Sequence, residues 1–284
     1  MPSRLAALAR LVPADGPADA ELLAAFVASR DDAAFAELVR RHGPAVLAVC
    51  RRVTTHTHDA EDAFQAAFLV LARKAHRVRP GAPLAAWLYG VALRAARKAA
   101  TRTFRRHDRE TLVADLPDVP ERAAERFAPD AARAVVEEVD RLAAKYRAAV
   151  VLCELEGRPR AAAARELGIA EGTLSSRLAA ARKTLAARLA ARGVAPAALA
   201  ALAADPVPPR LLAASSALAS GPAPAAVASL AHGVARAMTL KPLRTAGLTL
   251  GPERFQGHGA GDSVGEGRDR GRGRAGSQGG GGGE

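Results

Sequence analysis

The stretch Arg158–Leu189, RPRAAAARELGIAEGTLSSRLAAARKTLAARL, decides the fold of this chain. Two helical patterns are separated here by Gly168, a residue suited to the left-handed conformation that ends many helices. The second pattern opens near Glu171, where the positive end of a helix dipole favours an acid. Apolar residues three or four positions apart then mark one face of that helix: Leu174, Leu178, Ala181, Leu185 and Leu189. The pattern predicts two helices that meet at a steep angle around a glycine turn.

Two helices in this arrangement form a helix-turn-helix, whose second helix enters the major groove of duplex DNA. Hydroxyl and guanidinium groups on its first turns can read base edges, and cations further along suit phosphates. The candidate DNA contacts are therefore Thr173, Ser175, Ser176, Arg177, Arg182 and Lys183. The alternative interpretation is an ordinary helical hairpin with a solvated basic face.

The composition of the 284 residues favours helices and a polyanionic partner. Aromatic residues make up only 4% of the chain, Ala, Leu, Arg and Glu are abundant, and strand-like alternation is absent, so we expect an all-α fold. The formal charge of +12 and the pI near 10.9 point to nucleic acid. A G+C-rich genome also inflates Arg and Ala counts, so the position of the charge matters more than its sum.

Several functional classes are disfavoured by the residues present. Cys50 and Cys153, the only cysteines, each stand in an apolar helical pattern typical of small buried hydrophobes. His56 and His58 form a close pair without a third ligand, so we expect no metal and no cofactor. The acids do not converge as nuclease chemistry requires, so we expect no enzyme. The N-terminus lacks an apolar core behind a basic start, and we expect a cytoplasmic protein.

The first half of the chain predicts a small group of helices between residues 21 and 106. Asp31 and Asp32 provide an N-cap, and Gly43–Pro44 predicts the first turn of a further helix. The next helix, Asp59–Ala75, begins with acids and ends with cations, as the helix dipole prefers. Four polar residues lie off its core-facing stripe: Asp59, Glu61, Asp62 and Gln65. They predict either a solvated first turn or a docking surface for a basic partner.

A strongly basic helix follows at Leu84–Phe104, LAAWLYGVALRAARKAATRTF. Its cations, nearly unopposed by acids, continue just past its end: Arg94, Arg97, Lys98, Arg102, Arg105, Arg106 and Arg109. Trp87 stands at the start of this helix. An aromatic ring beside cations offers a surface on which unstacked bases stack while phosphates are held. The alternative is a core tryptophan beneath a solvated basic face.

Composition divides the chain into six segments. We expect a disordered N-terminus, a first small helical domain, a flexible linker, a second helical domain with the helix-turn-helix, an Ala/Pro-rich extension and a disordered Gly-rich tail, at residues 1–20, 21–106, 107–132, 133–192, 193–250 and 251–284. The uncharged run Leu211–Ala235 invites a membrane-spanning interpretation. Prolines, glycine and serines interrupt it and alanine adds little membrane affinity, so we expect no membrane span.

The order and spacing of these motifs resemble those of a bacterial RNA polymerase sigma factor of the extracytoplasmic-function type. The resemblance covers about Glu21–Arg192. DDAAFAELVRRHGPAVLAVCRRV followed by DAEDAFQAAFLVLARKA looks like region two, and VDRLAAKYRAAVVLCELEG with the helix-turn-helix is similar to region four. The resemblance implies a non-catalytic subunit that recruits core RNA polymerase to promoter DNA. The chain departs from residues common in the family at four positions: Arg94, Ala162, Ser175 and Ala180.

The resemblance also implies roles for the candidate residues. The four polar residues from Asp59 to Gln65 would bind the clamp helices of the polymerase β′ subunit, and region four would meet the β flap. Trp87 and the cations after it would melt and read the −10 element, and the helix-turn-helix would read the −35 element. The resemblance also allows for an anti-sigma protein as a partner. The alternative function is a stand-alone helix-turn-helix regulator that binds an operator without polymerase.

Overall fold

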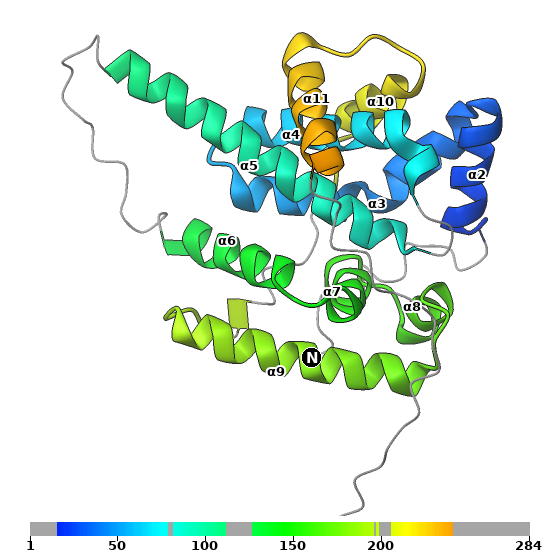
Figure 1. Cartoon of the computed structure of the whole chain (residues 1–284), viewed down its shortest axis with the longest axis vertical. Helices are drawn as coiled ribbons and strands as arrows, with labels where there is room; N and C mark the ends of the chain where they lie inside the picture. The colour runs from blue at the N-terminus through cyan, green and yellow to red at the C-terminus, as the bar shows by residue number, and fades with distance from the viewer. Residues whose placement is uncertain (1–15, 79–81, 112–126, 196, 199–205, 241–284) are drawn as a thin grey trace, which may run out of the picture. The chain divides into compact units, whose positions relative to one another are not determined.

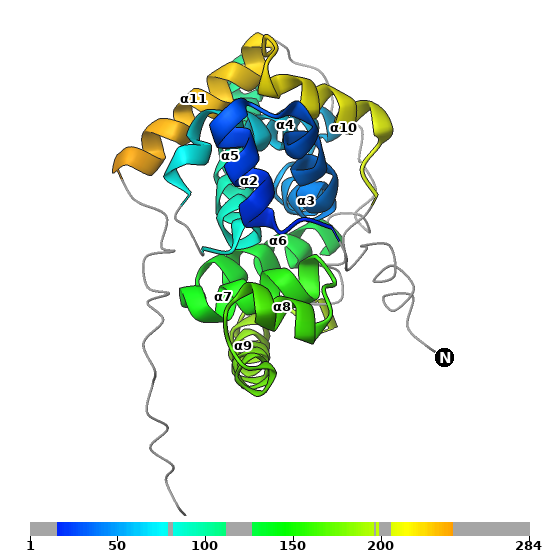
Figure 2. The ribbon, with the colours of Figure 1, turned by 90° about the vertical axis from the view of Figure 1, so that its right-hand side faces the viewer.

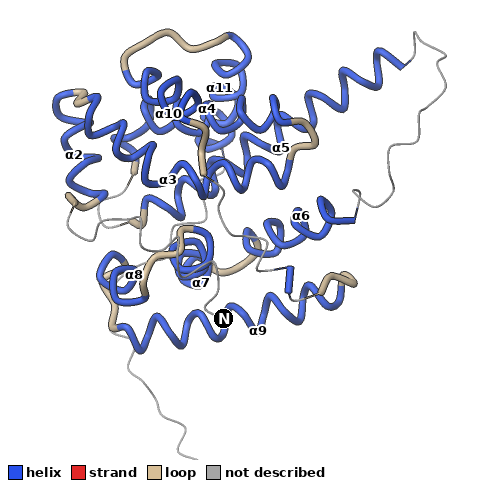
Figure 3. The backbone as a smooth tube through the Cα atoms, turned by 180° about the vertical axis from the view of Figure 1, so that it is seen from behind, coloured by secondary structure: helices blue, strands red, loops and turns tan. Residues whose placement is uncertain are grey.

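The computed structural model describes residues 16–78, 82–111, 127–195, 197–198 and 206–240, and every regular element in these ranges is helical (Figures 1 and 3). The N-terminal bundle contains α2 (Asp19–Ser29), α3 (Asp32–Val53), α4 (Thr57–Lys74), the short η2 (Ala75–Arg77) and α5 (Leu84–Thr111). The helix-turn-helix group contains α6 (Phe127–Asp140), α7 (Ala144–Val150), the π-helical turn η4 (Val151–Leu155), α8 (Arg160–Glu166) and α9 (Glu171–Ala191). The extension helices are α10 (Pro209–Ser216) and α11 (Ala225–Leu240), joined through η6 (Ala217–Ala219). The all-α prediction is confirmed.

Two pairs of phenylalanine rings lie at the centre of the N-terminal bundle. The ring centroids of Phe26 and Phe35 are 4.7 Å apart, and those of Phe64 and Phe68 are 5.0 Å apart. All four side chains are fully buried, and aromatic pairs at such distances add to the stabilisation from area burial. The first pair joins α2 to α3, while α3, α4 and α5 all pack against one another (Figure 2).

Helix α3 is one continuous helix where the sequence predicts two. Its N-cap is as predicted, because the Asp31 carboxylate accepts hydrogen bonds from the backbone N–H groups of Ala33 (2.9 Å) and Ala34 (3.1 Å). Gly43–Pro44, predicted to start a new helix, lie inside α3 instead. A proline in the interior of a helix costs roughly 3 kcal/mol, because it removes one backbone hydrogen bond and its ring clashes with the preceding turn. Side chains before and after this pair are buried in the bundle, and that tertiary packing overrides the local preference.

The helix-turn-helix forms where the sequence predicts it. Gly168 has a φ of 62°, in the left-handed region that glycine adopts without strain, and it follows the end of α8. Helix α9 then begins at Glu171. The predicted apolar stripe of α9 is fully buried and packs on α6 and α7. The sequence interpretation of this motif is confirmed.

Several predicted boundaries differ from the observed ones. Helix α2 begins at Asp19, ahead of the predicted onset of order at Glu21. Helix α5 continues to Thr111 and α6 starts at Phe127, so both run into the predicted linker. Six stretches lie outside the described residues, and the predictions of a disordered N-terminus, a flexible linker and a disordered tail fall largely on three of them: 1–15, 112–126 and 241–284.

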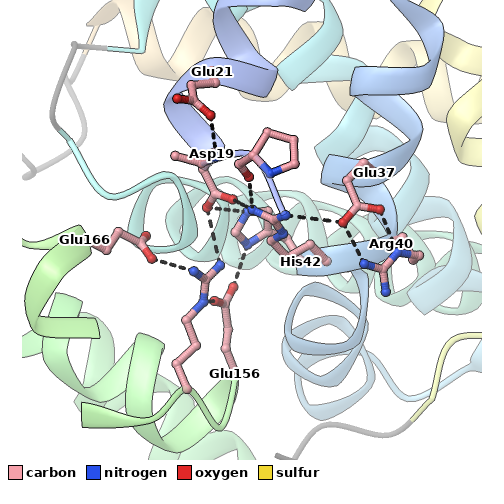
Figure 4. Close-up of polar contacts among 11 residues, drawn as sticks. Asp19, Glu21, Glu37, Arg40, His42, Glu156 and Glu166 are labelled. Atoms are coloured by element: carbon pink, nitrogen blue, oxygen red, sulfur yellow. Dashed lines mark hydrogen bonds and ion pairs between the residues drawn. The ribbon is translucent and has the colours of Figure 1, made fainter. Parts of the chain in front are cut away.

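A buried cluster of charges connects the N-terminal bundle to the helix-turn-helix group (Figure 4). His42 of α3 is fully buried; its Nδ1 lies 2.6 Å from Glu156, which follows η4, and its Nε2 lies 2.9 Å from Asp19. The Nε2 contact is poorly aligned for a hydrogen bond and is best described as an ion pair. Arg158 completes the cluster with contacts to Asp19 at 3.3 Å, Glu156 at 2.8 Å and Glu166 at 2.6 Å.

The charges of this cluster set one another's protonation. Burial alone would lower the pKa of His42, but the carboxylates of Glu156 and Asp19 outweigh it and raise the pKa to about 10. Burial opposes ionisation of Asp19 too, yet His42 and Arg158 hold its pKa well below the ordinary value. Burial raises the pKa of Glu166 to about 7. His42 is therefore a cation at neutral pH, enclosed by two carboxylates from different parts of the chain.

We predict that His42→Ala lowers the free energy of unfolding by about 3–5 kcal/mol, because two buried carboxylates lose their shared cation. The contribution of His42 is complete below its ordinary pKa of 6.5 and is lost as pH rises through about 10. Urea unfolding at about pH 7.5 and about pH 8.5 measures this loss. The unaltered chain should lose stability over this interval, and the variant should lose less.

The exposed His76 provides the matched control. His76→Ala should leave the free energy of unfolding nearly unchanged, because its side chain is exposed. Equal pH slopes for His42→Ala and the unaltered chain would contradict the role assigned to the buried imidazolium.

Candidate functional site

The acidic first turns of α4 are enclosed rather than solvated. Asp59 and Asp62 are only 7% and 6% exposed, and Glu61 and Gln65 are half-buried. Both aspartates point toward α5: Thr103 donates a hydrogen bond from Oγ1 to Asp59 at 2.7 Å. A solvated first turn, one of the two interpretations of the sequence, is therefore wrong for the aspartates.

Two further side chains neutralise acids of the same turns. Arg102 of α5 forms an ion pair with Asp62 at 3.3 Å. Arg210 of α10 forms one with Glu61 at 3.2 Å. The carboxylates predicted to face a partner thus have partners within the chain, one of them supplied by the extension.

The aromatic residues of α5 are distributed differently from the sequence expectation. Trp87 is 5% exposed and belongs to the bundle core, which agrees with the core alternative. Tyr89 is also buried and donates a hydrogen bond to the carbonyl of Val136 in α6 at 2.6 Å. Phe104, by contrast, is 70% exposed, and the only other exposed large hydrophobic side chain of the described residues is Val27 at 45%. The exposed aromatic of the basic helix is therefore Phe104.

Phe104 was not singled out by the sequence analysis, although a signal existed. The residue stands among cations and threonines at the end of the basic helix, where apolar neighbours at helical spacing have ceased. A large apolar residue at such a position has no core to enter. The single tryptophan drew attention because of its rarity, which says nothing about its exposure.

The cations of α5 occupy two kinds of surroundings. Arg94 is half-buried beside α6; burial lowers its pKa, and its Nη1 has no hydrogen-bond partner. Arg97 is exposed and pairs with Asp140 of α6 at 3.2 Å. Lys98 and Arg105 are exposed. The helix therefore presents a cationic surface beside Phe104, while single side chains of its earlier turns, Tyr89 and Arg97, contact α6.

The first turns of α9 present the predicted polar residues. Thr173 and Ser176 are exposed, and Ser175 and Arg177 are half-buried beside them. The Ser176 hydroxyl donates to the carbonyl of Gly172 at 3.0 Å. Arg177 carries a buried Nη1 without a hydrogen-bond partner. Because the opposite face of α9 is buried, these side chains form the accessible face of the helix.

The later cations of α9 differ from each other. Lys183 is exposed. Arg182 is exposed as well, but its guanidinium hydrogen-bonds Glu154 of η4, with Nε at 3.0 Å. A phosphate would therefore meet Lys183 directly and would compete with Glu154 for Arg182.

Two properties of the described ranges bear on function. No group of three or more His, Cys, Asp or Glu side chains there is arranged to hold a metal ion. No helix in those ranges combines the length and apolar character needed to cross a bilayer.

Comparisons with known proteins agree with this geometry. The Sigma-70 region 2 family matches residues 38–110, and the Sigma-70, region 4 family matches residues 132–185. The chain is 39% identical over 168 residues to the ECF RNA polymerase sigma factor SigM of Mycobacterium tuberculosis, which covers 59% of this chain and 83% of SigM. It is 33% identical over 124 residues to the RNA polymerase sigma factor CarQ of Myxococcus xanthus, which covers 44% of this chain and 71% of CarQ.

Among solved structures, the chain is similar to CnrH, determined in complex with the cytosolic domain of CnrY. The identity is 25%, with 62% of this chain and 99% of that chain covered, and the TM-score is 0.34. The sequence similarity carries the assignment: one matched region falls on the N-terminal bundle, the other falls on the helix-turn-helix group, and SigM is matched over most of its length. The chain belongs to the ECF family of RNA polymerase sigma factors.

Proposed function

We propose that this protein binds core RNA polymerase and directs transcription initiation at promoters with particular −10 and −35 elements, without catalysing a reaction of its own. The observation that carries the proposal is the presence, in one sigma-family chain, of a basic helix with an exposed aromatic and of a helix-turn-helix with an exposed polar face. We place its action in the cytoplasm, where bacterial promoter DNA lies.

The −35 element would be read by the first turns of α9. Thr173, Ser175, Ser176 and Arg177 would approach base edges, since hydroxyl and guanidinium groups there can form hydrogen bonds in the major groove. Arg182 and Lys183, further along the helix, would hold phosphates. The exposure of Thr173 and Ser176 supports this assignment.

The −10 element would be held by α5. Arg97, Lys98 and Arg105 are exposed and would contact the backbone of the opened strand. Phe104 takes the stacking role that the sequence analysis considered for Trp87. The remaining candidates, Arg94 and Arg102, would join this surface when their present neighbours in α6 and α4 release them.

Core polymerase would be bound by the acidic turns of α4. Asp59, Glu61, Asp62 and Gln65 would face the β′ clamp helices, and the helix-turn-helix group would face the β flap. Asp62 and Glu61 each form an ion pair with an arginine of this chain. Both carboxylates can therefore be reached by a guanidinium group, which supports their pairing with arginines of a basic partner.

The function can be tested by mixing the purified protein with bacterial core RNA polymerase. Binding to polymerase is measured first, and then transcription from DNA that lies upstream of the protein's own gene. We expect stable binding to polymerase and a discrete transcript. A folded protein that binds duplex DNA tightly but leaves core polymerase unbound would instead indicate the stand-alone regulator, acting as a dimer on paired half-sites.

Arg177→Ala should weaken promoter binding by the reconstituted holoenzyme by about 1–3 kcal/mol, because one base-edge contact is lost. Affinity for core polymerase should stay unchanged. Arg40→Ala, which removes an exposed cation from α3, is the matched control and should leave promoter binding intact. The assignment fails if Arg177→Ala and Arg40→Ala holoenzymes bind the promoter equally well.

Phe104→Ala should reduce affinity of the holoenzyme for opened −10 DNA by about 1–3 kcal/mol, the worth of one base stacked on an aromatic ring. Thermal stability should be unaffected because the ring is already exposed. Val27→Ala, at the other exposed hydrophobic position, provides the control. Unchanged binding of opened DNA by Phe104→Ala would remove Phe104 from the −10 surface.

A further inference from the structure

Helix α4 is enclosed on nearly all sides. Twelve of its 18 residues are buried, which is the pattern of a helix surrounded by protein rather than one lying on a surface. Helices α3 and α5 cover one side of it, and α10, η6 and α11 cover another. The helix proposed to bind polymerase is thus covered by the extension helices.

The contact between α11 and the bundle is built mainly from aliphatic side chains. Its inward-facing residues are all at most 2% exposed: Val227, Leu230, Ala231 and Val234. They pack against α4 and α5. Burial of such a stripe is the main force that holds a helix of this composition in place.

A glycine on each side of the interface lets side chains of the opposite side lie against its backbone. A Cβ at Gly43 of α3 would lie 3.2 Å from Cγ2 of Val207 and 3.3 Å from Cδ2 of Leu212. The side chain of Lys98 occupies the space that a Cβ at Gly233 of α11 would need. The extension therefore fits this bundle specifically rather than lying loosely on it.

Polar contacts at two points fix how the extension helices are positioned along the bundle. Arg210 of α10 pairs with Glu61, and Ser220 donates a hydrogen bond to the Asp32 carboxylate at the start of α3, with its oxygens 3.0 and 3.1 Å away. The contact at Glu61 occupies a residue assigned to polymerase. The side chain of Lys98, which is assigned to the −10 strand, lies beside Gly233 of α11 and remains exposed.

We propose that the extension helices are an intramolecular ligand of the N-terminal bundle that competes with core RNA polymerase for helix α4. This inference rests on the proposed function, in which α4 binds polymerase. The matched sigma regions end at residue 185, so the cover is supplied by a part of the chain that lies outside both regions. Polymerase would contact Glu61 and the covered face of α4 only after the extension helices dissociate from the bundle.

Competition and simple structural support lead to opposite expectations. If the extension only completed the bundle core, weakening its contact would reduce polymerase binding together with stability. If it competes, weakening its contact raises the fraction of molecules able to bind, and the apparent affinity for polymerase rises with it. The sign of the change in affinity therefore decides between the two.

Leu230→Asp and Ser229→Asp in the full chain form a matched pair. Both place a carboxylate on α11, but Leu230 is buried against the bundle while Ser229 is exposed. We expect Leu230→Asp to bind purified core polymerase about ten-fold more tightly than the unaltered chain, a shift typical of coupled equilibria. Ser229→Asp should bind like the unaltered chain.

Arg210→Glu provides a second variant that does not threaten folding. The Arg210 side chain is 78% exposed, and its replacement sets a like charge beside Glu61. We expect a few-fold gain in polymerase affinity. Hydrogen exchange supplies an independent readout: polymerase added to the unaltered chain should strip protection from α11 amides and leave α3 protected.

Each outcome has a definite meaning. Tighter binding by Arg210→Glu and folded Leu230→Asp, with α11 exposed in the complex, supports competition. Should Leu230→Asp lose its helical signal, Arg210→Glu and the exchange measurement decide alone. Equal affinities of the unaltered chain and Arg210→Glu, with α11 still protected in the complex, overturn competition while leaving polymerase binding intact. If no folded protein binds polymerase, the proposed function fails first.

Discussion

The packing of α4 between the bundle and the extension is the constraint on which the rest of the structure depends. This helix carries acids on its first turns and apolar residues nearly all round, so water cannot cover it without a large cost. Helix α5 supplies Arg102 and Thr103 to its aspartates, and α10 supplies Arg210 to its glutamate. The need to cover the apolar side chains of α4 and to pair its acids therefore fixes the positions of α5 and of the extension helices.

A second constraint is the buried charge cluster around His42. Ion pairs that are withdrawn from water gain little net stability, because desolvation offsets much of the attraction. Their geometry is demanding, however, and breaking one leaves an uncompensated buried charge. The cluster therefore serves to specify how Asp19 and α3 meet the segment from Glu156 to Glu166, more than to hold them tightly.

Local patterns predicted the parts of the structure that local physics decides. The apolar stripe of α9, the left-handed Gly168 and the cap at Asp31 all follow from spacing and backbone chemistry within a few residues. The continuity of α3 through Gly43–Pro44 could not be predicted this way, because packing on both sides of the pair compensates for a missing hydrogen bond. Trp87 was ambiguous for the same reason, since one residue's spacing does not reveal which neighbour covers it.

The two contacts that restrain the chain differ in the chemistry that can release them. The cluster at His42 consists of charges, so hydration and proton loss weaken it, and its strength falls as pH rises toward the pKa of about 10. The extension is held mainly by aliphatic side chains. Their burial is nearly independent of pH, and another apolar surface can replace it. A partner that covers α4 can thus displace the extension without disturbing His42. Separation of the N-terminal bundle from the helix-turn-helix group, by contrast, must break the charge cluster together with buried contacts such as the hydrogen bond from Tyr89 to Val136.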